Sequence, residues 1–288
     1  MAVLACSVDG ILQDPAAVDS LARATQYGDG LFETIAVIAL RPLFWAEHLQ
    51  RLRQGAVALG IALPDDHSLT SLWQDLLASL PATNPNQRLV LKILCVRSDG
   101  QGYATPQRSA ATLLFLLQEW PLRPKRYWQE GVCAGLSTVP LQCGAEYLTV
   151  KTLNRLNQIM AWRALPEEWQ EAVLCDQAGN LREGIQSNLC WRIGDRLLTP
   201  DLQDGGIAGI QLGAILQQAR SWGLTVEVVR EPAAEALERA EEILFCNSLI
   251  GSWPVRRWQE RDLPGAQGSL AQRLAGWGQQ LGLFPEIA

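Results

Sequence analysis

The amino-acid sequence predicts an α/β (α+β mixed) protein built as two lobes. The chain has 288 residues, a length at which a single core usually gives way to two. Hydrophobic residues make up 48% of it, which is enough for a packed core and excludes the disordered and fibrous classes. Strand-like and helix-like segments follow one another in irregular order, a pattern that favours a mixed sheet over a doubly wound parallel one.

Charge, cysteine usage and histidine content narrow the class further. The formal net charge of −6 disfavours nucleic acid as a partner, because binding to phosphates needs a basic face. No stretch reaches the roughly 18 apolar residues of a membrane helix, and the N-terminus lacks the features of a signal peptide. The seven scattered cysteines and two histidines form no ligand cluster, so we expect a cytoplasmic protein with reduced thiols and no metal.

The first lobe is expected over residues 1–118 and alternates strands with helices. Helical spacing of apolar residues predicts one helix from Glu47, with Leu49, Leu52, Ala56 and Leu59 on one face, and a second at 68–80. Apolar, β-rich runs predict strands at 2–6, 31–40, 43–45, 88–97 and 111–118, the third pairing back across the Arg41-Pro42 turn.

A linker is expected over 119–126, where Pro121 and Pro124 stiffen the chain and no apolar period runs. The second lobe then spans 127–288. Its strands are predicted at 131–139, 172–176, 189–193, 224–229 and 243–246. Its helices are predicted after Lys151, with Leu153, Leu156, Met160 and Ala164 on one face, after Gly205-Gly206, at 233–240 and at 270–281.

Chemistry that needs a primary amine has three candidates, because Lys92, Lys125 and Lys151 are the only lysines. Lys151 stands where a strand-like segment passes into a helix, a junction where side chains commonly face a cleft, although a surface lysine at a helix start fits as well. Lys92 lies inside an apolar strand, facing a cleft or an interface. Lys125 lies in the linker, where we expect a solvated lysine without a role in chemistry.

Three further features complete a set of groups. Glu183 stands in a turn between two strand segments, where carboxylates are usually solvated. Arg51 lies beside the apolar face of its helix, as a snorkelling arginine also would. The glycines of 205–209 precede a helix whose N-terminus can bind phosphate, although glycines there are commonly plain turn residues. An amine, a carboxylate, an arginine and a helix N-terminus are the groups that pyridoxal 5′-phosphate needs.

Six motifs in this order resemble the fold-type IV pyridoxal-phosphate enzymes, the class IV aminotransferase family. They are YGDGLFETIAV (27–37), HLQRL (48–52), VKTLNRLNQIMAW (150–162), LREGIQSNLCW (181–191), LTPDLQDGGIAGI (198–210) and CNSLIGSWPV (246–255). The resemblance implies a small N-terminal α/β lobe, a C-terminal lobe built as a distorted barrel, the cofactor between them, and a homodimer.

The same resemblance implies roles for individual residues. Lys151 would form the Schiff base with the cofactor aldehyde, and Glu183 would pair with the pyridine nitrogen. The phosphate would be held by Arg51, the backbone N–H groups of Ile210 and Gln211, and Ser248.

Within the family, GDGLFET (28–34) and KTLNRLNQ (151–158) are similar to the aminodeoxychorismate lyase branch. This implies a lyase that converts 4-amino-4-deoxychorismate to 4-aminobenzoate and pyruvate, a step toward folate. Arg97 and Lys92 are then candidates for the substrate carboxylates, while Gln101 stands where that branch commonly has a second arginine. The alternatives are a class IV aminotransferase acting on branched-chain or D-amino acids, and a dimeric binding module without cofactor.

Overall fold

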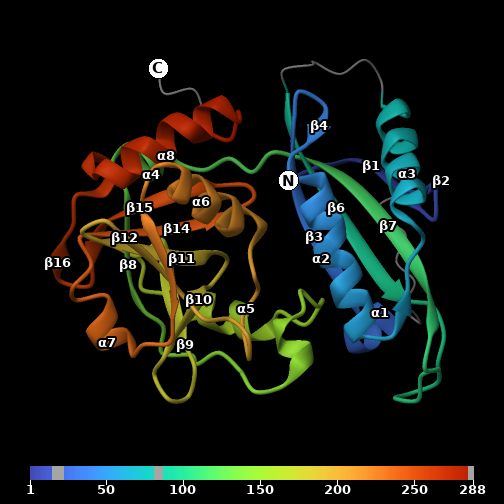
Figure 1. The fold of residues 1–288 in the computed structure, drawn as a ribbon. Helices are drawn as coiled ribbons and strands as arrows, with labels where there is room; N and C mark the ends of the chain where they lie inside the picture. Colours follow the sequence, from blue (N-terminus) through green and yellow to red (C-terminus); the bar gives the residue numbers. More distant parts are fainter. Residues whose placement is uncertain (15–22, 81–86, 285–288) are drawn as a thin grey trace. The chain divides into compact units, whose positions relative to one another are not determined.

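A computed structural model describes residues 1–14, 23–80 and 87–284. The described chain forms two compact units, drawn in Figure 1. Unit 1 comprises Met1–Leu122 and Val150–Asn154, and unit 2 comprises Arg123–Thr149 and Arg155–Ala288. The change from unit 1 to unit 2 after Leu122 falls within the stretch in which we expected the linker. The segment Val150–Asn154, which we expected in the second lobe, packs with unit 1 instead.

Unit 1 is a sheet with its helices packed against it (Figure 1). The strand order is β2-β1-β7-β6-β3-β4, with β5 beside β7. The strands are β1 (Val3–Val8), β2 (Ile11–Leu12), β3 (Gly30–Ile38), β4 (Arg41–Pro42), β5 (Ile61–Ala62), β6 (Arg88–Arg97) and β7 (Ser109–Glu119). The helices are α1 (Arg23–Tyr27), α2 (Trp45–Ala58) and α3 (Asp66–Ala78).

Strand alternation divides the side chains of the unit 1 sheet between its two faces. Leu31, Ile35 and Val37 of β3 join one core cluster with the apolar residues of α2 and α3. Phe32 and Thr34 therefore point to the opposite face, because successive residues of a strand alternate. Lys92 pairs with Thr34 across β3 and β6 and lies on that opposite face as well.

Unit 2 is a sheet that curls on itself. Its strand order is β10-β9-β8-β15-β14-β11-β12-β13, with β16 beside β15, yet β10 also contacts β11 and β12. The strands are β8 (Val132–Leu136), β9 (Glu171–Cys175), β10 (Leu181–Gly184), β11 (Asn188–Ile193), β12 (Arg196–Pro200), β13 (Thr225–Val229), β14 (Glu242–Asn247), β15 (Gly251–Trp258) and β16 (Arg261–Asp262). The pairs β8–β9, β8–β15 and β12–β13 are parallel.

Three core clusters stabilise unit 2, the smallest of which includes Ala161, Leu174 and Ile185. One fills the inside of the curl, with Trp191 and Trp253 both fully buried. Another packs α6 and α8 against the sheet through residues such as Ile215 and Leu274. The helices of this unit are α4 (Arg126–Gln129), η1 (Glu146–Thr149), α5 (Leu156–Arg163), α6 (Ile210–Ser221), α7 (Ala233–Ala236), η2 (Gly265–Gln267) and α8 (Ser269–Gln280).

The mixed α/β prediction is confirmed, but several of its parts are wrong. The expected strand at 43–45 is displaced to Arg41–Pro42, because the turn lies at Ala39-Leu40, where both residues have positive φ. Glu183 lies in β10 and not in a turn. Strands β12 and β15 were not predicted. Pro254 inside β15 is a residue that argues against a strand interior.

The predicted apolar face of the helix after Lys151 is also wrong. That helix, α5, begins only at Leu156 and buries Ala161 alone. Leu156 and Met160, two of the residues that predicted this helix, are exposed by 68% and 44%. The large apolar side chains of this short helix therefore do not pack into the core of unit 2.

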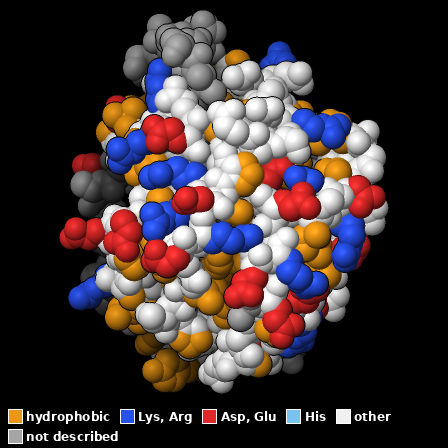
Figure 2. Space-filling model, turned by 90° about the vertical axis from the view of Figure 1, so that its left-hand side faces the viewer, with side chains coloured by type: hydrophobic (Ala, Val, Ile, Leu, Met, Phe, Trp, Pro, Cys, Tyr) orange, Lys and Arg blue, Asp and Glu red, His pale blue; other side chains and the backbone are white. Residues whose placement is uncertain are grey.

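The described surface carries charges of both signs close together. Figure 2 shows one face, seen from the side of β16, on which acidic and basic side chains are interspersed. Ion pairs such as Arg257 with Glu260 at 2.9 Å and Arg239 with Glu231 at 3.2 Å neutralise charge in unit 2. In the described part of the chain, no helix combines the length and the apolar character needed to cross a membrane.

Candidate active site

Lys151 is held on strand β3 of unit 1 by backbone hydrogen bonds on both sides. Phe32 N donates to Lys151 O at 3.0 Å, and Leu153 N donates to Gly30 O at 2.9 Å. Gly30 permits this approach, because a Cβ there would meet Leu153 Cδ1 at 3.0 Å and Cys95 O at 2.6 Å. These contacts explain why the segment belongs to unit 1, and they fix the backbone from which Lys151 projects.

The ammonium groups of two lysines lie near one aromatic ring. The Nζ of Lys151 lies 4.5 Å from the centroid of the Phe32 ring, and that of Lys92 lies 5.2 Å from the same centroid. Both distances fit cation–π contacts. Burial lowers the pKa of Lys92. The structure therefore brings the predicted amine and one predicted substrate ligand to the same ring.

Arg51 contacts a buried carboxylate that the sequence analysis did not single out. Its Nε donates to Glu33 Oε1 at 2.8 Å and its Nη2 to Glu33 Oε2 at 2.6 Å. His48 Nδ1 lies 2.7 Å from the same Oε2. Burial alone would raise the pKa of Glu33, but the hydrogen bonds from Arg51 and His48 hold it at about 2. Arg51 is thus oriented by an ionised partner and does not simply snorkel along α2.

Arg97 has several structural partners. Its Nε donates to Asp29 Oδ2 at 3.0 Å, its Nη1 to Ser109 Oγ at 3.1 Å, and its Nη2 to Leu59 O at 2.5 Å. Arg23 contacts the same Asp29 carboxylate at 2.8 Å. These contacts favour a structural role for Arg97, and its expected role toward a substrate carboxylate stays a prediction.

Glu183 of unit 2 is a buried carboxylate with a backbone donor. Only 5% of it is exposed, and Ile207 N donates to its Oε2 at 2.8 Å. Gln158 Nε2 lies 3.5 Å from its other oxygen. Burial lowers the pKa of Arg155, and the nearby charge of Glu183 opposes that shift. Glu183 is therefore a carboxyl group kept from water, with a backbone N–H as a hydrogen-bond donor.

Helix α6 of unit 2 begins without a side-chain cap. Gly209 is its N-cap residue, and a Cβ there would meet Asn188 Oδ1 at 1.8 Å. Asn188 in turn donates to Ile207 O at 2.7 Å. The backbone N–H groups of Ile210 and Gln211 start the helix, where amides have no intrahelical acceptor and attract anions.

Ser248 lies in the turn between β14 and β15. The neighbouring Asn247 Nδ2 donates to Gln186 O at 2.9 Å, in the hairpin that follows Glu183. The structure thereby links the turn that carries Ser248 to the hairpin that carries Glu183, both within unit 2.

Four residues that shape the candidate site were not predicted individually from the sequence: Phe32, Glu33, His48 and Ile207. One signal was present: Glu33 is an acid inside the apolar run 31–38, on the face that alternation assigns to the core. A buried acid requires a partner, and HLQRL on the next helix supplies two. No comparable signal marks Ile207, which acts through its backbone.

Fold and side chains together define one class of enzyme: the chain belongs to the amino-transferase class IV family, whose family model matches residues 30–258. The family predicted from the motifs is confirmed. Among relatives, the aminodeoxychorismate lyase of Vibrio harveyi is 27% identical over 259 residues, 88% of this chain and 93% of that protein. The aminodeoxychorismate lyase of Bacillus subtilis is 25% identical over 261 residues, 86% of this chain and 84% of that protein.

A solved structure gives the same result. The 4-amino-4-deoxychorismate lyase from Pseudomonas aeruginosa superposes with a TM-score of 0.84 at 33% identity, covering 97% of this chain and 100% of that one. The predicted fold class is thereby confirmed.

Proposed function

We propose that this protein is a pyridoxal-phosphate-dependent lyase that converts 4-amino-4-deoxychorismate to 4-aminobenzoate and pyruvate. The observation that carries the proposal is the placement of Lys151, whose amine lies on the Phe32 ring beside a second lysine. The named relatives supply the reaction, because two relatives and one solved structure that cover most of the chain carry that name.

The residues of each unit fit the cofactor. Unit 1 supplies the amine of Lys151 and the oriented guanidinium of Arg51. Unit 2 supplies the Glu183 carboxylate for the pyridine nitrogen, and the N-terminus of α6 for the phosphate, joined by Ser248. We propose that the two units correspond to the lobes expected at 1–118 and 127–288, joined by the linker at 119–126, except that Val150–Asn154 belongs to unit 1.

Bound pyridoxal phosphate supplies an aldehyde for the substrate amine and a ring that takes up electrons from the carbon bearing that amine. Lys151 Nζ, acting as a neutral amine, would take the proton from this carbon, and the bond between the adjacent ring carbon and the enolpyruvyl oxygen would break. The resulting ammonium would return a proton to the methylene carbon of the departing enolpyruvate, which gives pyruvate. Glu183 would keep the pyridine nitrogen protonated. Lys92 and Arg97 are proposed to hold substrate carboxylates, as a lysine ammonium and an arginine guanidinium can.

A class IV aminotransferase acting on branched-chain or D-amino acids is the second candidate, favoured by the description of the family itself. The two reactions use the same lysine and carboxylate. They are distinguished by adding 4-amino-4-deoxychorismate without any 2-oxo acid and following 4-aminobenzoate. Product formed under these conditions supports the lyase, whereas amino exchange with 2-oxoglutarate and no 4-aminobenzoate supports the aminotransferase.

The exposed row on α5 supports a homodimer. Leu156, Ile159, Met160 and Trp162 are all exposed large apolar side chains on this short helix. A contiguous apolar surface of this kind marks an interface. Ile159→Glu should shift the mass measured by light scattering from twice to once the chain mass.

We also propose that the protein is cytoplasmic, since all seven cysteines are free, as expected in a reducing compartment.

A further inference from the structure

A buried arginine lies where the register between β9 and β10, the strand that carries Glu183, shifts by one residue. Leu181 of β10 pairs with Cys175, but Glu183 pairs with Leu174, so Arg182 is the extra residue of a bulge. Bulges redirect side chains and are common beside active sites. The Arg182 side chain is 0% exposed, and in the described structure its partners are charged groups and a carbonyl.

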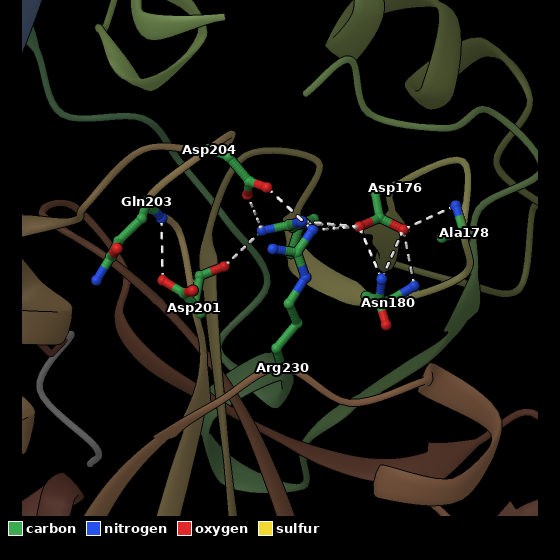
Figure 3. Close-up of polar contacts among 8 residues, drawn as sticks. Asp176, Ala178, Asn180, Asp201, Gln203, Asp204 and Arg230 are labelled. Atoms are coloured by element: carbon green, nitrogen blue, oxygen red, sulfur yellow. Dashed lines mark hydrogen bonds and ion pairs between the residues drawn. The ribbon is translucent and has the colours of Figure 1, made fainter. Parts of the chain in front are cut away.

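Arg182 joins three parts of unit 2. Its Nη2 contacts Asp176 Oδ2 at 2.7 Å, its Nη1 contacts Asp204 Oδ1 at 2.6 Å, and the same Nη1 donates to Asp201 O at 2.8 Å. Arg230 adds a second guanidinium, 2.9 Å from Asp204 (Figure 3). The buried Arg182 guanidinium is thus paired with two aspartates, as a buried charge requires, and the half-exposed Arg230 adds a second cation beside Asp204.

One side of this network is anchored in a rigid turn. Asp176 Oδ1 accepts hydrogen bonds from Ala178 N and Asn180 N, each at 2.9 Å (Figure 3). Although burial would raise the pKa of Asp176, the hydrogen bonds from Asn180 and Arg182 hold it at about 2. Asp176 therefore stays charged over the working pH range and gives Arg182 a fixed partner.

The other side of the network is the loop that contacts Glu183. Asp201 and Asp204 belong to the loop that continues through Gly206 to Ile207, whose N–H donates to Glu183 Oε2. Gly206 has φ +94°, a conformation that glycine adopts freely. A glycine-rich loop can adopt many backbone conformations unless contacts with other parts of the protein restrict it. Arg182 provides such contacts directly before the glycines.

We infer that Arg182 is a positioning residue: by holding the loop of Asp201 and Asp204 to the Asp176 turn, it keeps the Ile207 N–H on the Glu183 carboxylate. The inference rests on the proposed function, in which Glu183 pairs with the pyridine nitrogen. A hydrogen bond to the charged form favours ionisation, and an ionised Glu183 is the form that retains a proton on that nitrogen. The same loop leads into α6, so its position also sets the start of the phosphate-binding helix.

Arg182→Met tests the inference, with Arg196→Met as the matched control. Arg196 also forms a two-pronged pair, with Glu227 at 2.6 and 2.5 Å, but on the exposed edge of the same sheet. In apo-protein, hydrogen exchange of the amides of 205–209 should become about tenfold faster in Arg182→Met, the effect of a local loss of ~1.4 kcal/mol. Exchange in β11 should not change, and the control should behave as wild type.

Two measurements with pyridoxal phosphate complete the test. The Kd of Arg182→Met for pyridoxal phosphate should rise about tenfold. The pH titration of the visible absorbance of the holoenzyme should shift in the same direction as in Glu183→Gln. Unchanged loop exchange, or faster exchange with unchanged Kd and pH titration, would overturn the inference.

Two further variants separate the remaining outcomes. If Arg182→Met does not fold, Asp204→Asn tests the inference instead. Asp204 is 36% exposed, and asparagine has nearly the same shape as aspartate, so this variant should fold. Wild-type exchange and Kd in Asp204→Asn would again contradict the inference. If Glu183→Gln itself binds pyridoxal phosphate like wild type, the proposed function fails, whereas the loop exchange still reports on Arg182.

Discussion

Glu33 and Arg51 form a two-pronged ion pair, with nitrogen–oxygen distances of 2.8 and 2.6 Å, between the core face of β3 and helix α2. The carboxylate is almost fully buried, and His48 Nδ1 lies 2.7 Å from one of its oxygens. An arginine held in this way has a fixed orientation, which suits recognition of a phosphate by parallel donors.

Arg51→Ala should weaken the binding of pyridoxal phosphate. Hydrogen bonds between charged groups contribute roughly 1.5–3 kcal/mol, so the Kd should rise by about ten- to a hundredfold. Titration of apo-protein with cofactor, followed by absorbance, gives this number. An unchanged Kd together with a loss of stability would mean that Arg51 serves only Glu33 and the fold.

Glu33→Gln should destabilise the protein at neutral pH and much less at low pH. The pKa of Glu33 falls from 4.5 to about 2 on folding, so its ionised form stabilises the fold above pH 4.5 and this contribution is lost as the pH falls toward 2. The shift corresponds to a free energy on the order of 3 kcal/mol.

Urea unfolding of wild type and Glu33→Gln at several pH values measures this difference. Glu227→Gln, which removes a carboxylate from an exposed ion pair, is the control and should show little difference from wild type. A difference between Glu33→Gln and wild type that is the same at pH 3 and pH 7 would contradict the assigned pKa.

Glu171 should have the opposite pH dependence. Burial raises its pKa from 4.5 to about 7, although Ala172 N, Ile185 N and Ser187 Oγ donate to it. A raised pKa in the fold means that the protonated form is favoured, so stability contributed by Glu171 is present below pH 4.5 and is lost as the pH rises through 7. Glu171→Gln should therefore lose less stability than wild type between pH 5 and 8. Equal slopes for both proteins would show that Glu171 is ionised throughout.

Lys151→Ala should abolish the visible absorbance of bound cofactor and lower turnover by about a thousandfold, within the range expected for loss of an acid–base group. Lys125→Ala is the control, because Lys125 is exposed in the stretch expected as the linker. Borohydride reduction followed by peptide mapping should place the cofactor on the peptide with residue 151. A label on the Lys92 peptide would require a different assignment of the amine.

The sequence predicts the fold where patterns are periodic and local. The strand expected at 88–97 coincides with β6, and the apolar spacing of Leu49, Leu52 and Ala56 correctly places α2 on the core. The prediction fails where tertiary contacts override local signals. The Ala39-Leu40 turn has none of the glycine or asparagine that positive φ usually requires, and the apolar row on α5 does not face the core of its own chain.

Candidate site residues can be chosen from the sequence to the extent that chemistry limits the choice of residue. With three lysines in the chain, Lys151 is one of few candidates for the amine, and Glu183 and Arg51 are proposed from the motifs. The groups that orient them were not predictable in the same way. Ile207 contributes a backbone N–H, and Arg182 reaches Asp204 only through a bulge, a feature that depends on strand register.

The most direct test of the central claim is the stoichiometry of products from 4-amino-4-deoxychorismate. Purified protein loaded with pyridoxal phosphate, and supplied with no 2-oxo acid, should release 4-aminobenzoate and pyruvate in equal amounts, and Lys151→Ala should release both about a thousandfold more slowly. Amino transfer from a branched-chain or D-amino acid to 2-oxoglutarate, with no 4-aminobenzoate from 4-amino-4-deoxychorismate, would contradict the account.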